Sequence, residues 1–189
     1  GIIYFRVGEP FYKPHEYING GWSHPDNLGN HWLLVWVSEN IINNSTMLYN
    51  DSYYLPVGDS PWLAGNGSEG FLFLPFYILF GWPAGAGVLV SFILLATGIA
   101  GYYLGRNAGA DKWASLVAAA GCLSATYLQR ELSASRFSQI DVFWLVLSVG
   151  SFLPLLRPSI KNRFMSAIFC GLAVGLTAIF YWYYALFFV

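Results

Sequence analysis

The sequence has few charged residues. Only 10% of its 189 residues are Asp, Glu, Lys or Arg, whereas a soluble globular domain carries about 25%. A soluble fold of this length leaves much of its surface in water, so it cannot bury a composition that is 56% hydrophobic. The composition therefore predicts an all-α, polytopic integral membrane protein. The formal net charge of −1 and the lack of a basic patch give no indication of a nucleic-acid partner.

Cysteine is equally scarce. The two cysteines, Cys122 and Cys170, both lie inside apolar runs, and their spacing matches neither a metal site nor a disulfide framework. We interpret them as small apolar residues of a helix bundle. An initiator methionine and terminal capping signals are also missing, since the sequence begins at Gly1 and ends within the apolar run "AIFYWYYALFFV". We therefore expect a fragment of a longer protein.

Long apolar runs are the most prominent feature that the sequence does contain. Four of them are expected to cross the membrane, at 86–105, 113–128, 142–156 and 165–189. The first and the last have the 17 to 25 or so residues of a typical span, and the middle two are shorter but uncharged. The run 71–83 is too short and contains Pro75, so we expect an interfacial helix there. These boundaries divide the chain into a first loop, 1–85, and a transmembrane bundle, 86–189.

The basic residues predict the orientation of these spans. Arg106 and Lys112 fall in one short loop, and Arg157, Lys161 and Arg163 fall in another, two spans later. Because short cytoplasmic loops are enriched in Lys and Arg, both loops are predicted to be cytoplasmic. The segments 1–85 and 129–141 are then extracytoplasmic. Segment 1–85 agrees with this, since it has two basic and seven acidic residues.

Within the first loop, the stretch 30–42 has the length of a helix. Asn30 is a residue type that can cap its N-terminus. The stretch 44–70 is rich in Gly, Pro, Asn and Asp, which favours irregular structure over the membrane face.

Five stretches carry a resemblance to a known family: "HPDNLGNHWLLVWVSENI", "LPVGDSP", "PFYILFGWP", "YYLGRNAGADKWASLVAAAG" and "TYLQRELSASRFSQ". Their content and order resemble the N-terminal half of the GT-C superfamily, the membrane glycosyltransferases that use polyprenyl-phosphate sugars. The chain is most similar to bacterial and archaeal YfhO-like multi-pass membrane proteins. The resemblance covers most of residues 22 to 157. It implies a GT-C-like helical bundle with a long extracytoplasmic first loop bearing interfacial helices, in a prokaryotic inner membrane.

The resemblance implies a catalytic role for Asp26. In GT-C enzymes an acidic residue early in the first outer loop acts as the general base for the acceptor hydroxyl, which must lose its proton as the lipid phosphate leaves. The alternative is a turn or capping aspartate at the start of helix 30–42, a role for which "PDN" is well suited.

His24 and His31 flank Asp26 and are candidate substrate-binding residues. They could also hold a divalent metal with it, but no second carboxylate or Asp-x-Asp pair lies nearby. We therefore expect no metal or other cofactor, and histidines that hydrogen-bond within the loop.

Arg130 and Arg136 are candidate ligands of the donor phosphate, because arginine binds phosphate through paired donors and stays charged. The alternative is a structural ion pair of Arg130 with Glu131, or of Arg136 with Asp141.

The predicted function is extracytoplasmic transfer of a sugar from a polyprenyl-phosphate donor to an unidentified acceptor. The expected partners are membrane lipid and that donor. The alternative is a non-catalytic GT-C-like scaffold or complex subunit. A transporter is disfavoured, because the four expected spans contain no Asp, Glu, Lys, Arg or His.

Overall fold

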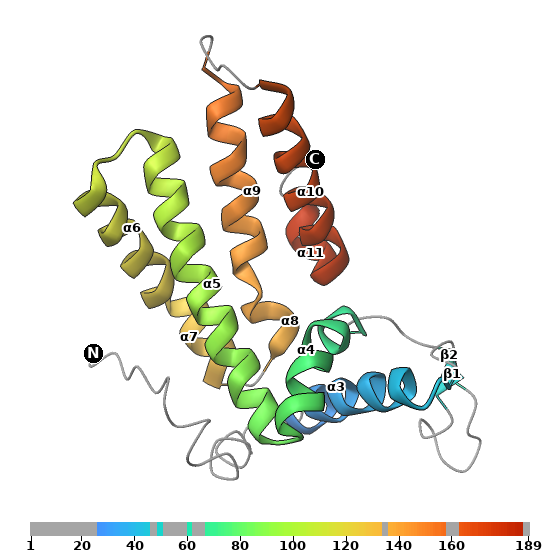
Figure 1. The fold of residues 1–189 in the computed structure, drawn as a ribbon. Coiled ribbons are helices and arrows are strands. Elements are labelled where there is room, and N and C mark those ends of the chain that lie inside the picture. The colour runs from blue at the N-terminus through green and yellow to red at the C-terminus, as the bar shows by residue number, and fades with distance from the viewer. Residues whose placement is uncertain are drawn as a thin grey trace.

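A computed structural model describes residues 26–45, 49–50, 60–61, 67–133, 136–157 and 163–186. The described part is mainly helical, as the sequence predicted (Figure 1). Two short strands, β1 (Tyr49–Asn50) and β2 (Ser60–Pro61), pair in antiparallel fashion within the first loop. His24 and Lys161 lie outside the described residues, as do 46–48, 51–59 and 62–66 of the stretch 44–70 that was expected to be irregular.

Four helices form the bundle: α5 (Ala84–Ala108), α6 (Lys112–Ser124), α9 (Val142–Leu155) and α10 (Arg163–Phe180). The remaining helices are α3 (Asp26–Ile42), α4 (Gly67–Phe80), α7 (Thr126–Ser133), α8 (Phe137–Ile140) and α11 (Trp182–Ala185). Helices α3, α4, α7 and α8 gather at the lower end of the bundle in Figure 1. We call this the cap end.

Two helices, α5 and α10, are long and apolar enough to cross a membrane. They have 25 and 18 residues, which at 1.5 Å per residue correspond to roughly 37 and 27 Å. Helices α6 and α9 have 13 and 14 residues, or roughly 20 Å each. The expected span 113–128 is broken at Ala125, and the expected span 165–189 is broken at Tyr181.

Helices α5 and α6 pack through glycine. A Cβ atom on Gly101 would lie 2.9 Å from the Cα of Ala119, and one on Gly105 would lie 2.9 Å from the Cα of Ser115. Only a residue without a side chain allows the two backbones to approach this closely, which is the way that small residues bring membrane helices together. The turn between the helices is fixed by Asp111, whose carboxylate accepts a hydrogen bond from the backbone N–H of Ala114 at 2.8 Å.

Hydrogen bonds join α9 to its two neighbours. The hydroxyl groups of Ser148 and Thr177 lie 3.1 Å apart across the α9–α10 contact. On the other side, the Asn107 amide donates to the Gly150 carbonyl at 3.0 Å and links α5 to α9. Polar side chains that bond to one another in this way satisfy their hydrogen-bonding groups without water.

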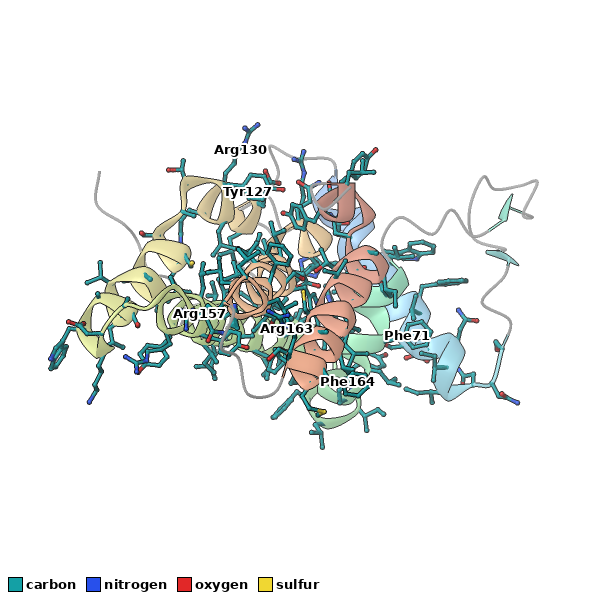
Figure 2. All side chains as sticks on the ribbon, turned by 90° about the horizontal axis from the view of Figure 1, so that it is seen from above. Phe71, Tyr127, Arg130, Arg157, Arg163 and Phe164 are labelled. Atoms are coloured by element: carbon teal, nitrogen blue, oxygen red, sulfur yellow. The ribbon has the colours of Figure 1, made fainter. Side chains whose placement is uncertain are left out.

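The two basic loops meet at the end of the bundle that is opposite the cap end. The Arg157 guanidinium donates to the carbonyl oxygen of Asn107, and Arg163 donates to the carbonyl of Arg157 at 3.3 Å. Seen along the bundle in Figure 2, Arg157 and Arg163 lie close to each other. We call this the basic end. Both loops lie at this end because α6 leads the chain away from it and α9 leads the chain back (Figure 1).

The first-loop helices differ from expectation at their boundaries. Helix α3 begins at Asp26, so Asn30 lies inside the helix, where it is buried, and cannot be the N-cap. Helix α4 continues through Pro75 and ends at Phe80. Gly81, with a φ of +67°, and Pro83 then separate α4 from α5. Helix α4 is a separate helix of 14 residues, the same length as α9.

Helices α3 and α4 form one unit. Val37 of α3 packs so closely on Gly70 of α4 that no side chain fits at position 70. The Tyr77 hydroxyl of α4 donates to the carboxylate of Glu39 on α3. The inner side of this unit joins the hydrophobic core of the bundle through Leu34 and Phe73, so α3 and α4 are packed on the bundle.

Candidate functional site

Four ionisable side chains are buried at the cap end. Their exposed fractions are 2% for His31, 1% for Glu69, 3% for Glu131 and 1% for Asp141. Lys, Glu, Arg and Asp are rarely so fully buried unless they are paired. A chain with few charges therefore places four ionisable groups within one end of its fold, and we take this region as the candidate functional site.

Glu69 lies in the first turn of α4. Its Oε2 atom is 3.4 Å from the Ser68 hydroxyl, which donates to the backbone carbonyl of Ile179 at 3.0 Å. The start of α4 is thereby attached to the end of α10. The other oxygen, Oε1, has no hydrogen-bond partner among the described residues. Burial raises the pKa of Glu69 to about 8, so the carboxyl group is mostly protonated at pH 7.

Asp141 lies between α8 and α9 and is the second unpaired acid. Within the described part of the chain, neither of its carboxyl oxygens has a hydrogen-bond partner. Burial raises the pKa of Asp141 well above its usual value, and the nearby negative charge of Glu69 raises it further. The two carboxyl groups therefore disfavour each other's ionisation, as expected for like charges that share a site of low polarity.

His31 is a packing residue between α3, α8 and the α4–α5 turn. Its ring makes an edge-on contact with Phe137, with centroids 4.9 Å apart, and its Nδ1 atom accepts a hydrogen bond from the Trp82 indole at 3.4 Å. Burial lowers the pKa of His31 to about 4, so the ring is neutral at pH 7. Its Nε2 atom has no hydrogen-bond partner in the ranges that the structure describes.

Glu131 of α7 is buried between the two candidate arginines. Its Oε2 atom lies 3.1 Å from the Nη1 atom of Arg136, and its Oε1 atom lies 4.0 Å from the Nε atom of Arg130. The ion pair of Arg136 is therefore with Glu131, whereas the sequence suggested Asp141. The Arg130 side chain is 72% exposed and extends from α7 at the edge of the molecule, near Tyr127 (Figure 2).

Tyrosines attach α11 to the same region. The Tyr184 hydroxyl lies 3.0 Å from the Tyr127 hydroxyl and 2.8 Å from the Gln139 carbonyl, so α11 contacts both α7 and α8. Tyr181 packs edge-on against Tyr184, with centroids 4.6 Å apart. Burial raises the pKa of Tyr184, which keeps the hydroxyl group protonated as a donor.

The structure brings together some of the predicted site residues. Asp26 is the first residue of α3, but its side chain and His24 are outside the described residues. His31, Arg130 and Arg136 all lie at the cap end. Among the described residues, no group of three or more His, Cys, Asp and Glu side chains is arranged to hold a metal ion.

The sequence did not identify Glu69 and Asp141 as a pair. Each lies beside an apolar run, in "SEGFLFL" and "QIDVFWLVL". An acidic residue at the edge of an apolar run is the sequence signal that could have identified them. This signal does not indicate which helix ends lie together in the fold. The burial of both acids depends on how α4 and α10 pack at the cap end, and Glu69 and Asp141 are more than 70 positions apart in the sequence.

Comparisons with known proteins identified no relative of this chain. No protein-family model, curated protein or solved structure matches the chain. The class of protein that the structure defines is thus a mainly helical protein with two helices that are long and apolar enough to cross a membrane.

Proposed function

We propose that this chain is part of a polytopic membrane glycosyltransferase of the GT-C type. It transfers a sugar from a polyprenyl-phosphate donor to an acceptor on the side of the membrane where the cap end lies. In this proposal α5, α6, α9 and α10 are four spans, and α3 and α4 lie at the membrane surface.

The apolar surface of the bundle supports a lipid environment. Large apolar side chains on α10 are exposed, among them Phe164 and Leu172, and the same is true of Leu79 on α4. Phe71 and Phe164 extend from one flank of the molecule in Figure 2. A soluble monomer rarely exposes contiguous apolar patches of more than a few hundred Å², whereas these side chains are suited to contact with acyl chains.

The distribution of positive charge supports the orientation. Arg106, Lys112, Arg157 and Arg163 all belong to the basic end. Because basic residues are enriched in short cytoplasmic loops, this end is assigned to the cytoplasm. The cap end, with its buried acids and its α3–α4 unit, is then extracytoplasmic.

The observation that carries the proposal is that α3 and α7 lie at the same end of the bundle (Figure 1). Helix α3 begins at Asp26, and α7 presents the exposed guanidinium group of Arg130. In the proposed reaction the Asp26 carboxylate removes the proton of the acceptor hydroxyl while the bond from the sugar carbon to the donor phosphate breaks. The guanidinium group binds the phosphate, which leaves with the bonding electron pair.

A specific observation favours the non-catalytic alternative for two of the four candidate binding residues. The charge of Arg136 is paired with a buried carboxylate, and His31 is neutral and packed between aromatic rings. Both side chains therefore have structural roles that are sufficient to explain them. This leaves Asp26 and Arg130 as the residues on which the enzymatic proposal depends.

The test is sugar transfer by the protein in membranes supplied with a polyprenyl-phosphate sugar. Asp26→Asn keeps the shape of the side chain and removes its basicity, so transfer should fall by about 10²- to 10⁴-fold while membrane insertion persists. Arg130→Ala should raise the donor concentration that is needed for half-maximal rate. Glu39→Gln, on the same helix α3, is the matched control and should leave turnover unchanged.

Unchanged turnover in Asp26→Asn would remove the catalytic role and leave Asp26 as a helix-terminal residue. A wild-type protein that transfers no sugar from a panel of donors would instead support the scaffold alternative.

A further inference from the structure

Two buried acids on different helices, both without an ionic partner among the described residues, need a physical explanation. Glu69 is in the first turn of α4, and Asp141 immediately precedes α9. Three of their four carboxyl oxygens have no hydrogen-bond partner within the described residues. Their neighbour Glu131, equally buried, has an arginine at 3.1 Å. The fold therefore provides a counter-charge for one buried acid and none for the other two.

The surroundings of the pair contain no described group that could neutralise two negative charges. From α3, the pair is approached by neutral His31, while Glu39 is exposed and bonded to Tyr77. From α10 and α11 the polar groups at the cap end are the Ile179 carbonyl and the Tyr184 hydroxyl, and Tyr181, between the two helices, is close to Glu131 and Arg136. At the cap end α5 is apolar, and α9 adds the Trp144 indole. Glu131 of α7 is paired with Arg136, which precedes α8, so that their charges cancel.

We propose that Glu69 and Asp141 form a pH-sensitive latch. When protonated, the two buried carboxyl groups allow the start of α4 to stay packed on the bundle and on the end of α10. When both groups ionise, two negative charges are buried at the cap end, and the α3–α4 unit separates from the bundle. The latch does not depend on sugar transfer.

The contacts that would separate are mainly apolar: Leu34 and Phe73 lie in the core of the bundle, and the His31 ring packs on Phe137, so ionisation of the two acids acts against this packing. Apart from the core residues, the attachment of the start of α4 to α10 described here is the single hydrogen bond from Ser68 to Ile179. Gly81 and Pro83 lie between α4 and α5 and give the unit a defined turn about which it can move. The α3–α4 contacts through Val37, Gly70 and Tyr77 are internal to the unit and would persist.

The direction of the pH effect follows from the raised pKa of Glu69. A group whose pKa is about 8 in the closed state and about 4.5 in the open, solvated state stabilises the closed state fully below pH 4.5. It loses that contribution as the pH rises to 8. Between pH 6 and pH 9, Glu69 alone should shift the equilibrium towards the open state by about 100-fold.

Hydrogen exchange of the protein in lipid nanodiscs measures this shift. After correction for the pH dependence of intrinsic exchange, the protection of the α4 amides near residues 70–74 should fall by up to about 100-fold from pH 6 to pH 9. Amides in the middle of α5 should keep their protection. The double variant Glu69→Gln/Asp141→Asn should retain α4 protection at pH 9, and Glu39→Gln should behave like the wild type.

Protection of α4 that does not change between pH 6 and pH 9 in the wild type would overturn the latch. An equal fall in the double variant would do the same, because it would place the titrating group elsewhere. If the double variant does not fold, Glu69→Gln alone provides the test, since it removes the group whose pKa burial raises to about 8 and should reduce the pH dependence. Sugar-transfer activity is not part of these readouts, so loss of the glycosyltransferase proposal would leave them interpretable.

Discussion

The glycine contact between α5 and α6 leads to a quantitative prediction. Gly101→Ala places a methyl group 2.9 Å from the Cα of Ala119 and 2.9 Å from the Cys122 sulfur atom. One of these neighbours is a backbone atom, so the helices must move apart. Overpacking of this kind costs about 1–3 kcal/mol. The substitution also removes a helix-interior glycine, which by itself stabilises a helix by about 0.5–1 kcal/mol.

Gly121→Ala isolates the steric part of this effect. Gly121 is on α6, is exposed, and has no atom within 4 Å of its Cβ position among the described residues. Both variants gain the same backbone contribution, so their difference in unfolding free energy should be about 1–3 kcal/mol. At about 2–4 °C per kcal/mol, Gly101→Ala should unfold roughly 2–12 °C below Gly121→Ala in a thermal scan in detergent micelles. Equal unfolding temperatures would show that α5 and α6 do not approach as closely as the structure indicates.

Two further predictions concern the cap end. Arg136→Ala leaves the buried Glu131 carboxylate without its closest cation and should destabilise the protein by about 3 kcal/mol, whereas Arg130→Ala, at a mostly exposed side chain, should change stability by no more than about 0.5 kcal/mol. Denaturation of the two variants in parallel measures the difference, and similar losses would contradict the assignment of Arg136 as the main partner. The pKa of about 4 for His31 lies below its unfolded value near 6.5, so the contribution of the neutral ring is present above pH 6.5 and is lost as the pH falls towards 4. The loss should reach about 3 kcal/mol, and His31→Phe should unfold with less dependence on pH in this range; an unchanged dependence would assign it to other groups.

The apolar runs identified the four bundle helices but not α7, α8 and α11, and the helix boundaries show the limit of this kind of prediction. Hydropathy located the cores of α5, α9 and α10, because burial in lipid or protein requires those residues to be apolar. It did not locate the break at Ala125, where the sequence "LSATYL" has neither proline nor glycine to mark a helix end. That break is a consequence of tertiary packing, which places α7 against α8 and not in line with α6.

The start of α3 shows a second limit. Asp26 and Asn30 are both residue types that favour a helix N-terminus, and composition alone does not choose between them. The choice comes from burial, since Asn30 lies on the side of α3 that also carries the buried residues Leu34 and Val37. A helix that began at Asn30 would lose the first turn that precedes His31.

The candidate site was predicted in part: His31, Arg130 and Arg136 lie at the cap end, but the burial of the acids there was not predicted. Arg130 and Arg136 were identified from residue type and from their location in an outer loop, and both lie at the cap end. Glu131 was considered only as an ion-pair partner, and Glu69 only as one of many outer charges. Their burial is a property of helices far apart in sequence. The sequence around a charged residue is the same whether the fold leaves that residue in solvent or buries it.

The burial of these acids also limits which residue can be the general base. A base must lie within hydrogen-bonding distance of the proton that it removes, and this requirement comes before any consideration of pKa. Glu69 and Asp141 are enclosed in the closed structure, and Glu131 is enclosed and bonded to Arg136. None of these three can receive a proton from an acceptor hydroxyl while α4 remains packed on the bundle. The enzymatic proposal therefore depends on Asp26, at the start of the helix that the latch residues help to hold in place.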